Sequence, residues 1–184
     1  MRRTFLAMMS LAVLASWPMT ASASLSASAT LTPQQLGPNS YEYSLTLTNT
    51  GTTPIGTYWF SWIPGYDLLP TAPTSIVSPP GWKGTDQREG IGSGSVQWVN
   101  TTTPLQPGKS LGGFIFDSPD APSKISGTSF FAGLPVEQSF VYVGAPETDP
   151  GFNFVTTTVT PEPASIGLLA ASALLLFRRR RHSV

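Results

Sequence analysis

The sequence contains no cysteine and only one histidine in 184 residues. Without cysteine the chain has no disulfide framework, no thiolate metal site and no cysteine nucleophile, and it lacks the residue on which bacterial lipoproteins are anchored. The histidine, His182, lies in a basic C-terminal segment, so the body of the chain has no histidine to act as a general base. We therefore expect no enzymatic activity, no cofactor and no metal site.

Charge is also scarce, at 11% of residues, and it is unevenly distributed. Six of the ten basic residues lie at the two ends, which leaves residues 24–160 with four basic and nine acidic residues, a net charge of −5. Phosphate binding needs a basic surface. The charge balance therefore excludes nucleic acid as a partner.

The chain is rich in turn-forming and aromatic residues. Glycine and proline together number 35, and there are five Trp, ten Phe and five Tyr to fill a core. Short apolar or alternating runs separated by turn residues predict about eight strands, and no stretch of the body has a sustained helical period. The expected strands are residues 25–31, 41–47, 55–62, 74–77, 95–99, 111–116, 128–131 and 139–143.

Two motifs refine this all-β prediction. Residues 45–51, Leu-Thr-Leu-Thr-Asn-Thr-Gly, read as a strand that ends in a turn, and residues 105–111, Leu-Gln-Pro-Gly-Lys-Ser-Leu, as a turn that leads into a strand. Together they resemble the Ig-like or fibronectin-like domains of bacterial surface proteins. The resemblance implies a single Ig-like β-sandwich, which we assign to residues 24–156.

The N-terminal segment predicts export. Arg2-Arg3 is followed by an apolar run over residues 5–15 and by the small residues Ala21-Ser22-Ala23. This order is typical of a secretory signal peptide. We expect signal peptidase to cut after Ala23, which makes residues 1–23 the signal, with Ala27 and Ala29 as alternative cleavage sites. Export could follow either the general or the twin-arginine route.

The C-terminal segment combines three features. Residues 157–163 form an expected linker that ends in Pro161-Glu162-Pro163, and residues 164–177 are an uncharged apolar run. As a helix this run would be about 21 Å long, shorter than the ~30 Å hydrocarbon core. A basic block follows, made of Arg178, Arg179, Arg180 and Arg181. It acts as a stop-transfer signal, so the membrane helix and tail, residues 164–184, should end in the cytoplasm.

This order of tripeptide, apolar run and arginine block resembles the PEP-CTERM sorting signal of Gram-negative, biofilm-forming bacteria. The resemblance covers only the C-terminal tail. It implies recognition by an exosortase, which would cut near Pro161-Glu162-Pro163. It further implies an inner-membrane precursor that is later released to the cell surface or extracellular matrix.

For the body we expect a structural or adhesive role, with a carbohydrate-binding module for matrix polysaccharide as the alternative. Exposed Trp and Tyr side chains stack on sugar rings, and Trp82, which follows Pro80-Gly81 in an expected loop, is the candidate sugar-binding residue. Strand alternation predicts that Tyr58, Phe60 and Trp62 share one face and Trp59 the other. Trp98 lies in an expected strand and is assigned to the core.

Two pairs of carboxylates remain as candidates for acid–base chemistry. Asp86 and Glu89 share one segment, and Asp117 and Asp120 share another. Both pairs lie among Pro, Gly, Ser and Lys. We interpret them as solvated turn residues.

Overall fold

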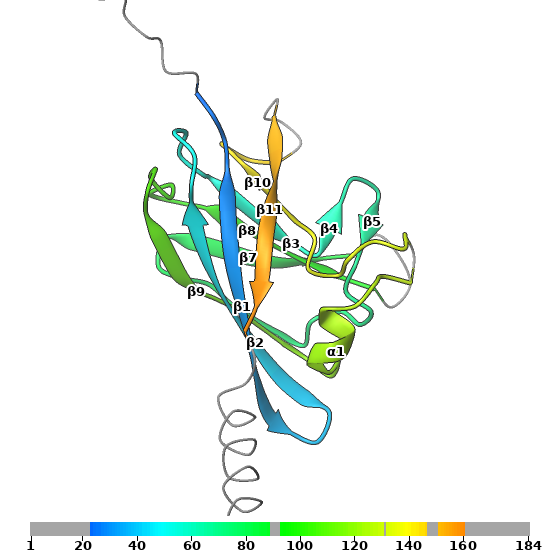
Figure 1. Ribbon diagram of the computed structural model, residues 1–184. Coiled ribbons are helices and arrows are strands. Elements are labelled where there is room, and N and C mark those ends of the chain that lie inside the picture. The colour runs from blue at the N-terminus through cyan, green and yellow to red at the C-terminus, as the bar shows by residue number, and fades with distance from the viewer. Residues whose placement is uncertain (1–22, 89–92, 131, 147–150, 161–184) are drawn as a thin grey trace, which may run out of the picture.

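The computed structural model describes residues 23–88, 93–130, 132–146 and 151–160 (Figure 1). Almost all regular structure in these residues is β, with one short helix, α1 (Pro122–Ile125). The strands are β1 (Ala27–Gly37), β2 (Ser40–Asn49), β3 (Thr57–Phe60), β4 (Trp62–Ile63), β5 (Tyr66–Asp67), β6 (Ser75–Val77), β7 (Trp82–Gln87), β8 (Ser95–Asn100), β9 (Ser110–Ser118), β10 (Ser139–Tyr142) and β11 (Phe152–Val159).

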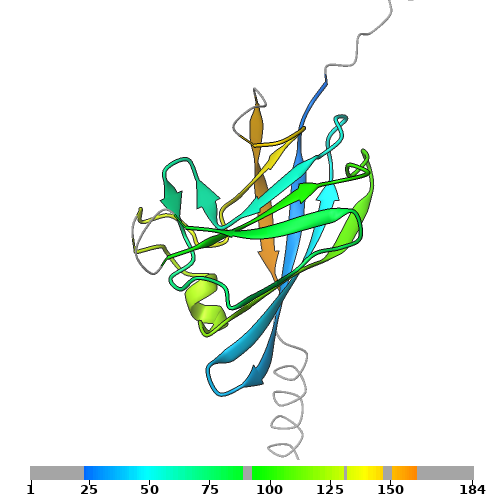
Figure 2. The same ribbon diagram turned by 180° about the vertical axis from the view of Figure 1, so that it is seen from behind.

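Nine strands form one continuous sheet in the order β6-β9-β2-β1-β11-β10-β3-β8-β7. The neighbours in this sheet are antiparallel except for β1 and β11, which are parallel. The remaining two strands, β4 and β5, form a separate hairpin beside it (Figure 1). Because β1 and β11 are parallel, residues 23 and 160 lie at opposite ends of the domain (Figures 1 and 2).

The sheet curls so that β7 and β8 cross over β1 and β11 (Figure 2). Its two edge strands then come close together. The Gly84 N–H donates to Ser78 Oγ at 2.7 Å, and the indole N–H of Trp98 donates to the Val77 carbonyl at 3.1 Å. At Gly84 an added Cβ would lie 2.5 Å from Ile76 Cγ2, so glycine permits this approach. The result is a sandwich that is partly closed like a barrel.

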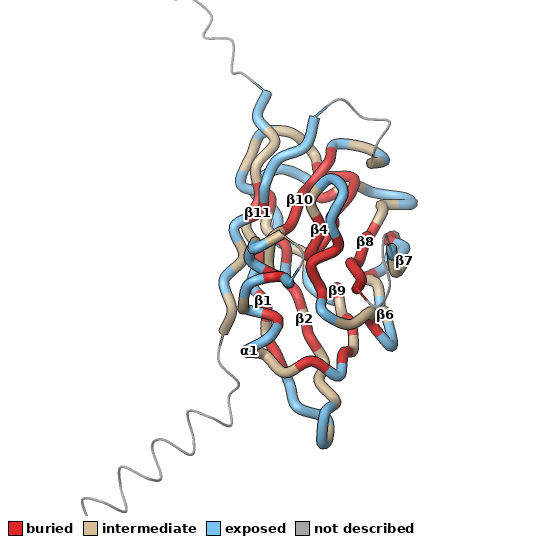
Figure 3. The backbone as a smooth tube through the Cα atoms, turned by 90° about the vertical axis from the view of Figure 1, so that its right-hand side faces the viewer, coloured by how far each residue is buried: buried red, intermediate tan, exposed pale blue. Residues whose placement is uncertain are grey.

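The main core fills the space between the two layers. Leu31, Leu45 and Leu47 from one layer face Tyr58 and Trp98 from the other, and all are at most 1% exposed. Aromatic rings make many of the contacts; the rings of Tyr58 and Trp98, for example, are stacked with centroids 5.8 Å apart. In Figure 3 the buried stretches run through the middle of the molecule, with exposed residues outside.

The all-β prediction is confirmed, and several expected strands match β1, β2, β6, β8, β9 and β10. Residues 128–131 do not form a strand; Thr128 makes only an isolated bridge to Pro135. β7 and β11 were not predicted, because neither has apolar residues at every second position. β11 continues to Val159, so the boundary expected at residue 156 falls inside a strand.

The expected sorting signals lie outside the described residues. These include Ala21, the Pro161-Glu162-Pro163 motif, the apolar run 164–177 and the arginine block, whereas Ala23 is described and exposed. Within the described ranges no helix is long and apolar enough to span a bilayer.

Candidate functional site

A second cluster of aromatic residues covers the outer face of β3, β10 and β11. We call this the aromatic face; it comprises Trp59, Trp62, Phe140, Tyr142, Phe152 and Phe154. Strand register brings these residues together. Phe140 pairs with Trp59 on one side and with Phe154 on the other, and Tyr142 pairs with Phe152. Paired residues on adjacent strands point to the same side of a sheet, so the rings gather on one surface.

Trp62 belongs to this face, contrary to the prediction that it shares a face with Tyr58 and Phe60. Between β3 and β4, Ser61 adopts a positive φ of 57°, which interrupts the strand alternation. Trp62 therefore turns to the side of Trp59, and their rings stack with centroids 3.8 Å apart and planes 6° from parallel. The Ser61 hydroxyl donates to the Val136 carbonyl, and the Leu68 N–H donates to the Ser61 carbonyl at 2.8 Å.

The aromatic face has a buried base and an exposed top. Trp59, Trp62, Phe140 and Tyr142 are all at most 5% exposed, whereas Phe152 is 47% and Phe154 53% exposed. Phe140 joins the two parts, since its ring centroid lies 4.7 Å from that of Phe152 and 4.5 Å from that of Phe154. The two exposed rings are therefore held against a rigid base while presenting about half of their surface to solvent.

Polar contacts fix the base in place. The Trp59 indole N–H donates to Ser95 Oγ at 2.9 Å, and the Ser95 hydroxyl donates to Asp67 Oδ1 at 2.8 Å. Asp67 lies on β5 and is only 3% exposed. This chain of hydrogen bonds ties the β4–β5 hairpin to the main sheet beneath it.

The expectation that Trp82 is exposed is wrong. Trp82 is the first residue of β7 and only 7% exposed, and its ring packs edge-on against Phe114 with centroids 5.3 Å apart. The curl of the sheet brings β7 over the core and buries a side chain that sequence alone placed in a loop. Trp98 is fully buried, which confirms its assignment to the core.

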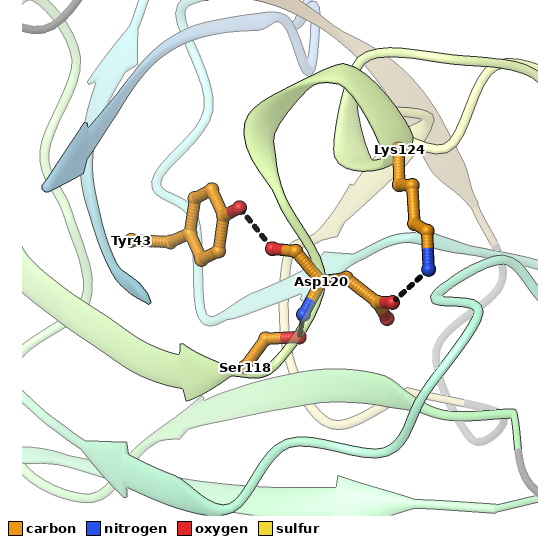
Figure 4. Close-up of polar contacts among 4 residues, drawn as sticks. All are labelled: Tyr43, Ser118, Asp120 and Lys124. Carbon is orange, nitrogen blue, oxygen red and sulfur yellow. Dashed lines mark hydrogen bonds and ion pairs between the residues drawn. The ribbon is translucent and has the colours of Figure 1, made fainter. Parts of the chain in front are cut away.

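The structure places three of the four candidate carboxylates. Asp120 is not a solvated turn residue, because its side chain is 4% exposed and its Oδ1 accepts from Lys124 Nζ at 3.2 Å (Figure 4). Its backbone carbonyl accepts from the Tyr43 hydroxyl, and its N–H donates to Ser118 Oγ at 3.1 Å. These contacts anchor the segment that leads into α1.

The other three candidate carboxylates lie apart from this segment or outside the described residues. Asp86 pairs with Arg88, and Glu89 lies outside the described residues. Asp117 lies in β9. Among the residues described, no group of three or more His, Cys, Asp and Glu side chains is placed to hold a metal ion.

One serine lies in a Gly-x-Ser-x-Gly pattern, Ser110 in Gly108-Lys109-Ser110-Leu111-Gly112. The nucleophile elbow of hydrolases needs this pattern on a sharp turn between a strand and a helix. Ser110 instead begins β9, and its hydroxyl hydrogen-bonds to the Thr48 hydroxyl at 2.8 Å. The match therefore does not provide an activated nucleophile.

Among the described residues, one titratable group has a clearly shifted pKa, and it belongs to the core. Tyr58 is fully buried, and burial raises the pKa of its phenol above the ordinary value of 10.0. The neutral phenol is therefore strongly favoured in the folded state. This tyrosine lies on the inner side of β3, away from the aromatic face.

No family model matches the chain, and no curated protein matches it. Among solved structures it is similar to an exo-β-N-acetylglucosaminidase of family GH20 from Vibrio harveyi, with 12% identity, a TM-score of 0.44 and 74% of this chain covered. The chain spans only about a fifth of the length of that enzyme, 19%.

Two smaller structures are also similar. The chitin-binding domain of Chi18aC from Streptomyces coelicolor has 18% identity and a TM-score of 0.36, covering 73% of this chain and 94% of that one. A biomass-sensing module from Clostridium thermocellum, described as resembling a family 3 carbohydrate-binding module, has 12% identity and a TM-score of 0.35. This match covers 53% of this chain and 67% of that one. These similarities are too weak to bear on function.

Proposed function

We propose that this protein binds polysaccharide through its aromatic face. The observation that carries the proposal is the pair Phe152 and Phe154, two half-exposed rings fixed on a buried aromatic base. Apolar rings held at a protein surface gain free energy when a partner removes them from water. The C–H-bearing face of a sugar ring is a flat apolar partner that such rings can stack against.

The base of the site favours recognition without rearrangement. Phe140 supports both exposed rings and is 1% exposed, so neither ring has to be ordered when a ligand arrives. A preorganised surface loses less conformational entropy on binding. An aromatic face on the outside of a sheet, with no cleft required, suits an extended polymer.

Export and sorting form the second part of the proposal and rest on the sequence. The signal-like residues 1–23 support export, and Pro161-Glu162-Pro163 with the apolar run and Arg178–Arg181 supports processing by an exosortase. The protein would then act at the cell surface or in the extracellular matrix as a non-enzymatic, adhesive Ig-like domain. Polysaccharide binding gives that adhesive role a physical basis.

The position of β11 is compatible with such processing. The Thr160 N–H donates to the Leu31 carbonyl at 2.9 Å, so the folded domain extends to the residue directly before Pro161. A cut at the tripeptide would leave β11 and the aromatic face intact.

The test is retention of the full chain, purified in detergent, on microcrystalline cellulose and on chitin. The double variant Phe152→Ala/Phe154→Ala should bind at least tenfold more weakly, a loss of about 1.4 kcal/mol or more. Phe130→Ala is the matched control, since Phe130 is 92% exposed but outside the aromatic face. Failure of the wild-type chain to bind either polymer, or equal binding by the double variant, would overturn the proposal.

A further inference from the structure

The sheet surface next to the aromatic face carries hydroxyl groups at consecutive outward positions on three neighbouring strands. On β11, Thr156 and Thr158 follow Phe154 at alternate positions and therefore face the same side. Their partners on β1, and the partners of those residues on β2, point to the same side of the sheet. We call these residues the hydroxyl rows: Thr156–Ser28–Thr48, Thr158–Thr30–Thr46 and Thr32–Ser44.

The inward side of the same strands is apolar. Ala29, Leu31, Leu45, Leu47 and Val155 alternate with the hydroxyl residues and are at most 5% exposed. The core thus fixes the orientation of every hydroxyl in the rows, because a shift of one residue would turn the apolar side chains outward. The outward residues are held in a fixed pattern on a rigid sheet.

The middle row is both exposed and free of internal partners. Thr30, Thr46 and Thr158 are exposed, and within the described part of the chain none of their side chains makes a hydrogen bond. At the corners of the rows, by contrast, Thr48 pairs with Ser110 at 2.8 Å and Thr32 with Thr160 at 2.8 Å. The middle row therefore offers hydroxyls that a ligand can engage directly.

The combined surface carries no charge. The hydroxyl rows and the aromatic face contain no Asp, Glu, Lys or Arg. Lys83 and Lys124 lie on β7 and α1, whereas Lys109 directly precedes Ser110, which pairs with Thr48 at the end of the first row. At the other end of the rows, Glu42 lies two residues from Ser44 on the same side of β2 and pairs with Asp117 on β9. These two carboxylates and the net charge of −5 on residues 24–160 would repel an anionic polymer.

We propose that the hydroxyl rows and the aromatic face form one platform that binds the surface of an ordered, neutral polysaccharide. The inference rests on the proposed function and names its substrate class. The strands β2, β1, β11 and β10 together span about 14 Å at the usual strand spacing. This width lets several adjacent sugar chains contact the protein at once, with rings stacking on Phe152 and Phe154 and hydroxyls bonding to the middle row.

The experiment uses the full chain in detergent with three probes: microcrystalline cellulose or chitin particles, the matching soluble hexasaccharide, and alginate as an anionic polymer. The key variant is Thr30→Val/Thr46→Val/Thr158→Val, which keeps the β-branched shape and removes only the hydroxyls. Thr102→Val/Thr103→Val is the control, because both threonines are exposed on a loop outside the rows.

The platform predicts that the triple variant loses at least tenfold in affinity for the particles and keeps its affinity for the hexasaccharide. Phe152→Ala/Phe154→Ala should lose affinity for both. Unchanged particle binding by the triple variant, wild-type binding to the hexasaccharide alone, or preference for alginate would each overturn the platform while leaving sugar binding in place. If the wild-type chain binds none of the three probes, the proposed function itself fails.

Discussion

Trp62 lies face to face with Trp59, with ring centroids 3.8 Å apart, although only two residues separate them in the chain. Regular alternation would place them on opposite sides of a strand. The positive φ of Ser61 removes this alternation and folds the β4–β5 hairpin back over β3. The base of the aromatic face is therefore made by a local backbone feature.

Because of this stacking, we expect Trp62→Ala to destabilise the domain strongly. Trp62 is 5% exposed and also packs against Phe140, so truncation should lower the free energy of unfolding by about 3–5 kcal/mol. Urea unfolding measures the loss. A cost below about 1 kcal/mol would show that the hairpin does not depend on the stacked pair.

A second prediction concerns the two core tryptophans. Trp82→Ala and Trp98→Ala should each destabilise the domain by about 3–5 kcal/mol, since both side chains are buried and both pack against Phe114. Phe130→Ala, which removes an exposed ring, should lower the free energy of unfolding far less. Normal stability of Trp82→Ala would contradict the burial of β7 against the core.

A third prediction follows from Tyr58. Its folded-state pKa is raised above the unfolded value near 10, so above about pH 10 the unfolded chain loses a proton that the folded chain keeps. Stability should be intact below pH 10 and fall by up to about 1.4 kcal/mol per pH unit above it. Tyr58→Phe should reduce this slope, measured by urea unfolding at pH 8 and pH 11. An identical slope in the variant would contradict the assignment.

The central position of β11 in the sheet predicts that two C-terminal truncations differ sharply in stability. A chain that ends at Gly151 loses the strand between β1 and β10, which exposes two strand edges and the core around Val155. It should be unfolded by circular dichroism and rapidly degraded by protease. A chain that ends at Thr160 keeps β11 and should be as stable as the full domain; equal behaviour of the two truncations would be the contrary result.

The sorting proposal predicts separable effects in the tail. Glu162→Ala leaves the apolar run and Arg178–Arg181 unchanged, so the protein should still be exported and anchored but accumulate at precursor length in the inner membrane. Mass spectrometry of the C-terminus in a host with an exosortase measures this. Wild-type protein that ends at Val184 in that host would show the tail to be a simple anchor.

Local patterns in the sequence were sufficient to predict that the domain is all-β. The alternation of Ala29 and Leu31 with threonine, and of Tyr43, Leu45 and Leu47 with polar residues, predicts strands with one buried face, and these residues are buried in β1 and β2. Period-two burial depends only on neighbouring residues, because successive side chains on a strand point to opposite faces. The core assignment of Trp98 follows from the same rule.

The candidate site was decided by tertiary structure. Phe152 and Phe154 gain their positions because β11 pairs with β10 and β1, which are distant in the chain, and Trp82 is buried because the curled sheet closes over it. Such pairings are set by long-range contacts that no local period encodes. The sequence by itself determined that this chain is built of strands with an apolar side, and only the packing of those strands decided which aromatic rings reach solvent.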